Sequence, residues 1–137
     1  MISPLSHTGE YILQPTLIWK HKKTLEWIST ATFWKRELAF FQKLLDEYAP
    51  RFSSEADKMK IGHFQSLIIY YRDELINQLT SKLRLHEKRL AELLEKKNES
   101  DVEYFKEHAD LMGELDATST QFSTNKEELF SFIERVM

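Results

Sequence analysis

Apolar residues recur along most of this chain at alternating steps of three and four residues, in three series separated near Pro50 and Asn98. Such steps place side chains on one face of an α-helix, whereas no useful stretch shows the period of two that a half-buried strand requires. The pattern therefore predicts an all-α fold. The three series are Trp27, Ala31, Trp34, Leu38, Phe41, Leu45 and Tyr48; Ile61, Phe64, Ile68, Tyr71, Leu75, Leu79, Leu83, His86, Leu90 and Leu93; and Phe105, His108, Met112, Leu115, Ser119, Phe122, Lys126, Leu129, Ile133 and Val136.

Residues with special backbone roles set the expected helix boundaries. Prolines and a glycine mark the first fifteen residues as irregular, and Pro50 ends the first helix. Ser54 followed by Asp57 resembles a capping box, and Ser100 followed by Glu103 resembles one more clearly. The predicted elements are an irregular segment at 1–15 and helices at about 16–49, 54–98 and 100–136.

Three places in these helices leave alternatives open. The run 28–32 is rich in β-branched residues and could break the first helix. Thr124 with Glu127 could cap a new start and break the third helix near 118–124. In the second helix, three leucines from Leu75 onward follow at steps of four, which resembles a stutter that locally unwinds a supercoil.

Short connections between the helices predict one domain, 1–137, built as an antiparallel, up-down-up bundle of three long helices with coiled-coil-like packing. This arrangement resembles three-helix coiled-coil domains such as spectrin-type repeats, which carry a tryptophan on their first helix. The resemblance is architectural and implies no activity.

The three predicted helices differ in length. With about 1.5 Å of rise per residue, the first helix is expected to begin near the height of Glu87, leaving roughly 15 Å of the hairpin formed by the other two uncovered. The N-terminal segment or another subunit would have to cover this hairpin tip. Offset apolar stripes add to the exposed surface: Leu25, Phe33, Phe40 and Leu44 on the first helix, and Ile69, Ile76 and Leu85 on the second. The candidate partner-binding residues are Leu90, Leu93, Leu94, Val102 and Phe105 at the tip, with Ile69 and Ile76 on the second helix.

Composition narrows the class of protein. Of 137 residues, 42% are hydrophobic and 30% charged, and 19 basic against 22 acidic residues give a net charge of −3. These values suit a compact domain and not a disordered chain. The absence of cysteine excludes disulfides, thiolate nucleophiles and cysteine-ligated metals. The sequence has no secretory signal, and its longest apolar run has five residues, 67–71. We therefore expect a cytoplasmic protein with no membrane partner.

Sequence motifs for catalysis are missing. The chain has no glycine-rich phosphate loop, no G-x-S-x-G turn and no HExxH sequence, so we expect neither an enzyme nor a cofactor. Basic residues gather on the first two helices near His21 and His86, but acidic residues of the third helix reach the same end. Opposite charges on neighbouring helices usually pair with each other, so nucleic acid is not expected as a partner.

Three histidines, His21, His86 and His108, fall within a few helical turns of one another by the same count. Imidazoles inside a helical bundle can bind zinc, manganese or iron. However, no histidine of this chain has a carboxylate three residues before it, or a second ligand four residues after it, as the known metal-binding bundles do. We therefore expect no metal, and partly buried histidines bonded to solvent or to a carboxylate.

These observations favour a small interaction or scaffold module that self-associates as a homodimer or binds a helical protein partner. The alternative is a metal- or small-ligand-binding bundle that uses His86 and His108.

Overall fold

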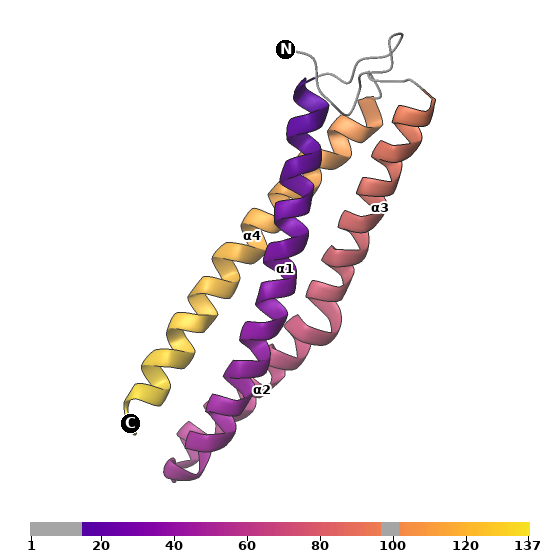
Figure 1. Ribbon diagram of the computed structural model, residues 1–137. Helices are drawn as coiled ribbons and strands as arrows, with labels where there is room; N and C mark the ends of the chain where they lie inside the picture. The colour runs from indigo at the N-terminus through magenta and orange to yellow at the C-terminus, as the bar shows by residue number, and fades with distance from the viewer. Residues whose placement is uncertain (1–14, 97–101) are drawn as a thin grey trace.

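The computed structural model describes residues 15–96 and 102–137, and almost all of them are helical. The helices form three rods that lie side by side (Figure 1). The first rod is α1, Pro15–Tyr48, which a short 3₁₀ turn, Ala49–Arg51, follows. The second contains α2, Glu55–Tyr70, the π-helical turn η3, Tyr71–Leu75, and α3, Ile76–Glu95. The third rod is α4, Val102–Glu134.

The all-α prediction is therefore confirmed for the described residues, which include no strand, and the helix bounds lie close to those expected. The start of α2 is capped as predicted, because the Asp57 backbone N–H donates to Ser54 Oγ at 3.1 Å. The second proposed cap begins at Ser100, which lies outside the described residues. None of the described helices is both long enough and apolar enough to cross a bilayer.

Neither of the breaks left open by the sequence occurs, since α1 and α4 run without interruption. The hydroxyl of Thr32 donates to the Ile28 carbonyl at 2.9 Å, and that of Thr124 donates to the Thr120 carbonyl at 3.1 Å. Threonine side chains that bond back to the preceding turn are compatible with a helix. Tertiary packing of residues such as the fully buried Ala31 then outweighs the weak local preference against helix.

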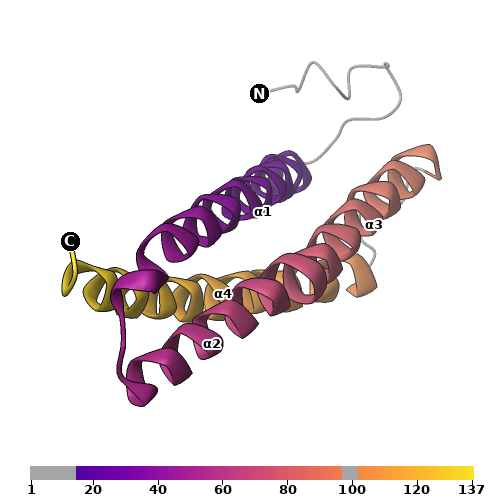
Figure 2. The same cartoon turned by 90° about the horizontal axis from the view of Figure 1, so that it is seen from below.

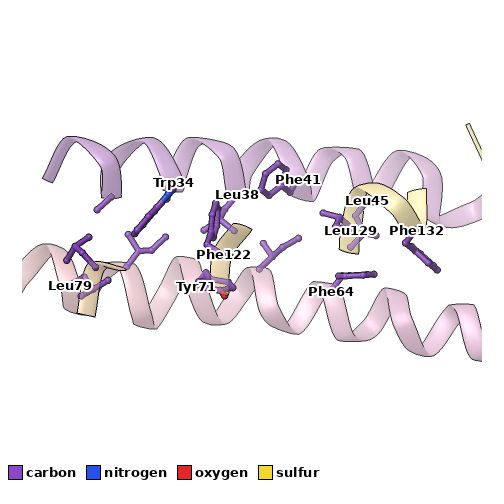
Figure 3. Packing of buried hydrophobic residues seen from close by; sticks show 14 of the residues in the cluster. Trp34, Leu38, Phe41, Leu45, Phe64, Tyr71, Leu79, Phe122, Leu129 and Phe132 are labelled. Carbon is purple, nitrogen blue, oxygen red and sulfur yellow. The ribbon is translucent and has the colours of Figure 1, made fainter. Parts of the chain in front are cut away.

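Aromatic rings fill much of the main core, which lies between the three rods (Figures 2 and 3). Phe122 of α4 contacts Trp34 of α1 at 5.5 Å between ring centroids, and meets Tyr71 edge-on at 5.3 Å. The Asn125 amide donates to the Tyr71 hydroxyl at 2.7 Å. Burial raises the pKa of Tyr71, so this hydroxyl stays neutral and keeps the core free of charge.

The π-helical turn shifts which face of the second rod is buried. Ile68, before the turn, and Tyr71, its first residue, lie in the core, and the next fully buried residue is Ile76, five positions after Tyr71. A π-turn inserts one extra residue and rotates everything that follows around the helix axis. The sequence placed the irregular step between Leu75 and Leu83, whereas the π-turn lies just before it, at Tyr71–Leu75, and the change of buried face was not predicted. Ile76 is a core residue and not a surface contact, whereas Ile69 is 47% exposed as expected.

The buried face of α4 also differs from the predicted one. Met112 and Ser119 are exposed, and Leu111 and Thr118 are buried in their place. From His108 to Phe122 the buried positions still alternate steps of three and four residues, but each step of three comes before a step of four, whereas the prediction had the step of four first. A helix that packs against two neighbours buries a broad face, so periodicity alone does not choose between adjacent positions.

The hairpin tip is not left uncovered as expected, because α1 extends over it. His21, and not the start of α1, lies at the height of Glu87, to which it is hydrogen bonded. The helix continues six residues beyond His21 to Pro15, about 9 Å further. Leu17 therefore covers the tip and forms a second apolar cluster with Leu90, Leu93 and Tyr104, all of them buried. Leu94 and Phe105 are partly buried against this cluster, and only Val102 is strongly exposed. The N-terminal segment proposed as a cover lies outside the described residues.

The π-turn predicts that Ile76 and Ile69, which the sequence analysis grouped together as candidate contacts, contribute differently to stability. Ile76→Ala removes a fully buried side chain and should lower the free energy of unfolding by about 2–5 kcal/mol. Ile69→Ala is the matched control at a half-exposed site and should cost less than about 1 kcal/mol. Urea denaturation at neutral pH measures both, and equal losses would contradict this register of the second rod.

Candidate functional site: a polar layer between two apolar clusters

Polar side chains separate the main core from the second cluster on every rod. On α1, Thr24 lies between Leu17 and Ala31. On α3, His86 and Glu87 lie between Leu83 and Leu90, and on α4, Glu107 and His108 lie between Tyr104 and Leu111. With His21, these residues form what we term the polar layer. Burying polar groups costs free energy unless they are hydrogen bonded, and helical cores are mostly apolar. The layer is therefore the most distinctive chemical feature of the described residues.

His86 is the centre of the layer and is fully buried. Its Nδ1 lies 2.6 Å from Glu107 Oε1, and its Nε2 lies 2.9 Å from His108 Nδ1. A carboxylate only accepts hydrogen bonds, so His86 Nδ1 carries a proton and donates it. When His86 is neutral, its Nε2 then has no proton and accepts from His108 Nδ1–H. The chain of hydrogen bonds Glu107–His86–His108 thus fixes the tautomers of both rings.

Neighbouring side chains hold this chain in place. Arg89 donates to the second oxygen of Glu107, which anchors the carboxylate at the protein surface. The Tyr104 ring stacks on the His86 ring, with 4.3 Å between centroids and 2° between planes. The indole of Trp27 covers His108 from α1, at 4.7 Å between centroids. Burial and the nearby carboxylates raise the pKa of Tyr104, so its hydroxyl remains protonated.

The pKa of His108 is lower than that of an ordinary histidine. His108 is only 5% exposed, and its pKa is lowered from 6.5 to about 4. Burial is the main cause, and the positive charge of Lys20 and the neighbouring His86 add to it. His108 is therefore neutral at pH 7 and remains so in moderately acidic solution.

A second, separate contact joins α1 to the hairpin. His21 Nδ1 donates to Glu87 Oε2 at 2.7 Å, and both side chains are partly exposed. The other carboxylate oxygen, Oε1, is buried and has no hydrogen-bond partner among the described residues. Thr24 is fully buried and satisfies its hydroxyl by donating to the Lys20 carbonyl at 2.8 Å.

The metal candidates from the sequence are thus only partly brought together. His86 and His108 are in direct contact, but the nitrogens that face each other are engaged in their shared hydrogen bond. His21 is bonded to Glu87 instead. Within 15–96 and 102–137, no group of three or more histidine and carboxylate side chains is arranged to hold a metal ion.

The sequence brought the two histidines together and correctly predicted a bond to a carboxylate, which Glu107 supplies to His86, but it predicted partly buried rings, whereas both rings are buried. Counting residues from the turn at Pro50 brought His86 and His108 within a helical turn of each other. The roles of Glu107, Arg89 and Tyr104 depend on side-chain direction, which counting does not resolve. The position of Glu107 beside His108, on the helix facing His86, was the one available signal.

An open groove between α2 and α4 lies far from the polar layer. Phe64 and Phe132 contribute apolar surface to it, Lys60 lines it from α2, and Glu127 and Glu128 line it from α4. Both signs of charge are present, so the groove favours neither anionic nor cationic ligands.

Three large aromatic residues lie exposed along α1 and form what we term the aromatic row. Trp19 is 62% exposed, and Phe33 and Phe40 are each 57% exposed. They are separated by fourteen and seven residues, that is, by whole heptads. Residues at heptad spacing drift by only about 20° per repeat around a straight helix, so the three rings share one outward face.

Comparisons with known proteins add no assignment. No protein-family model matches the chain, and neither the curated proteins nor the solved structures include a significant match.

The lowered pKa of His108 predicts a specific loss of stability in acid. Between pH 6.5 and 4 the unfolded chain binds a proton at His108 that the folded chain does not bind, so stability falls as pH falls. At pH 5 the loss from this one group should be on the order of 2 kcal/mol relative to pH 8.

His108→Asn tests this prediction because asparagine offers an amide N–H₂ in place of Nδ1–H and does not titrate. Urea denaturation from pH 8 to 5 should show a smaller decline for this variant than for the wild type. His63→Asn, at an exposed histidine of α2, is the matched control and should behave as wild type. A decline in His108→Asn as steep as that of the wild type would contradict the assignment.

Proposed function

We propose that this chain is a small interaction or scaffold module, an up-down-up bundle with coiled-coil-like packing, that self-associates through the outer face of α1. The observation that carries the proposal is the aromatic row. Large aromatic side chains exposed on one outward face of a helix form an apolar surface that a second helix can cover. Three such rings left in water are a surface that gains from burial.

This contact surface is narrower than the one expected from the sequence. Ile76, Leu90 and Leu93 already pack within the chain and are removed from the candidate contacts. Of the remaining sequence candidates, Ile69 and Val102 are exposed on other rods. We therefore place the proposed contact surface on α1, whose opposite face packs against α2, α3 and α4.

A second copy of the chain is the proposed partner. Two-fold dimers bring the same surface of each protomer together, so one exposed row suffices to form the contact. The net charge of −3 on 137 residues is small and offers little repulsion between copies.

The alternative, a bundle that binds a metal or small ligand through His86 and His108, requires the hydrogen bond between the two rings to break. Metal analysis of the purified protein separates the two proposals. Stoichiometric metal that is lost on replacing both histidines would favour the alternative.

The self-association proposal is tested with Phe33→Gln/Phe40→Gln, since glutamine keeps helix propensity and removes the rings. Burying the exposed half of each ring contributes about 1–1.5 kcal/mol, and a two-fold dimer buries two such rings from each protomer, so the double variant should raise the dimer dissociation constant by about three to four orders of magnitude. Sedimentation velocity across a dilution series measures it.

A matched control replaces exposed residues of α2 in the same way, as Met59→Gln/Tyr70→Gln, and should leave the dissociation constant unchanged. A wild-type protein that has the mass of one chain at every concentration would rule out self-association.

A further inference from the structure

Among residues 15–96 and 102–137, the end of the bundle beyond the polar layer has a smaller apolar cluster than the rest. Four of these residues are buried in that cluster, whereas eighteen are buried in the main core. On the α1 side, the described contacts with this end are Leu17 and Ile18 in the cluster, the His21–Glu87 hydrogen bond, and Lys20 over the Phe105 ring at 5.5 Å. Regions with few buried apolar contacts open locally at lower free energy than the rest of a protein.

The hydrogen-bonded pair can accept one added proton without losing its geometry. The added proton binds His108 Nε2 while the His108 Nδ1 proton moves to His86 Nε2, so His86 becomes the imidazolium. Its Nδ1–H still donates to Glu107, and its Nε2–H now donates to His108 Nδ1. The added charge lies next to the Glu107 carboxylate, so it forms an ion pair.

A second proton cannot be accommodated in this geometry. It would reside on His108, and both facing nitrogens would then carry hydrogens at a separation of 2.9 Å. Two imidazolium rings would also be buried in contact with each other, with Lys20 adding to the repulsion. Opening the layer to water removes both the close approach of the two N–H hydrogens and the repulsion between the two buried charges.

The charged groups around His108 come from all three rods, and not all of them favour opening. On α3, Arg89 is engaged with Glu107 of α4, and this contact holds the carboxylate beside His86. On α1, the hydrogen bond of His21 to Glu87 of α3 holds the two helices together and so opposes opening. The Tyr104 hydroxyl of α4 stays neutral throughout. His108 is therefore the group whose protonation drives the change.

We propose that the polar layer is a proton-operated latch: protonation of His108 releases the first turns of α1 from the hairpin and exposes the Leu17–Leu90–Leu93–Tyr104 cluster, while the main core stays folded. The released surface is apolar, so in acid this end of the molecule gains a contact surface that is hidden at neutral pH. This inference does not depend on self-association through the aromatic row.

Hydrogen–deuterium exchange of the full chain, corrected for the intrinsic pH dependence of exchange, tests the latch. From pH 7.5 to pH 5, peptides covering 17–24, 86–93 and 104–108 should lose protection by up to roughly thirtyfold, which is the proton linkage of one such histidine. Peptides covering 34–45, 64–71 and 122–133 in the main core should lose much less.

His108→Asn should abolish the selective loss at this end, and His63→Asn should retain it. If His108→Asn does not fold, the wild-type comparison between the two sets of peptides still decides the matter. Equal loss of protection in both sets, no loss at either, or a wild-type acid response in folded His108→Asn would each overturn the proposal.

Discussion

The hydrogen bond between His86 and His108 sets the register of the bundle. A fully buried imidazole has two nitrogens to satisfy, and in this layer one is bonded to a carboxylate and the other to a second imidazole. These requirements fix the rotation of α3 against α4, and the Trp27 ring brings α1 to the same level. An apolar layer could slide by a turn with little loss, whereas this one has a single register in which its donors and acceptors match.

The layer also divides the bundle into a large main core and a small apolar cluster at the other end. The main core is stabilised by rings that contact one another across all three rods, such as Trp34, Phe122 and Tyr71. The π-helical turn lies at the level of these rings and aligns the two halves of the second rod, because it returns the apolar face of α3 to the interior. Without the inserted residue, the face that carries His86 would be rotated away from α4, so the π-turn and the polar layer are parts of one arrangement.

Much of this could be predicted from the sequence, because steps of three and four residues are a direct consequence of helix geometry. The three rods, the capped start at Ser54, the irregular step in the second rod and the proximity of His86 to His108 were all found in that way. The burial of Ile76 was missed, because periodicity indicates an irregularity without saying how the chain resolves it. The cover over Leu90 and Leu93 was missed because counting assumed that the rods begin level at the Pro50 turn. A bond from a histidine to a carboxylate was expected, but the choice of Glu107 and the contacts of Arg89 and Tyr104 were not, because they depend on side-chain rotamers.

Nitrogen-15 NMR of the histidine rings through an acid titration probes the buried pair itself, because it reports the tautomer and the protonation of each imidazole. At pH 5 we expect His108 to be neutral with its proton on Nδ1 or Nε2 alone, and the His86 Nδ1 to be protonated at every pH at which the protein is folded. Rings that both titrate near pH 6.5 and are independent of each other would contradict the buried, hydrogen-bonded pair.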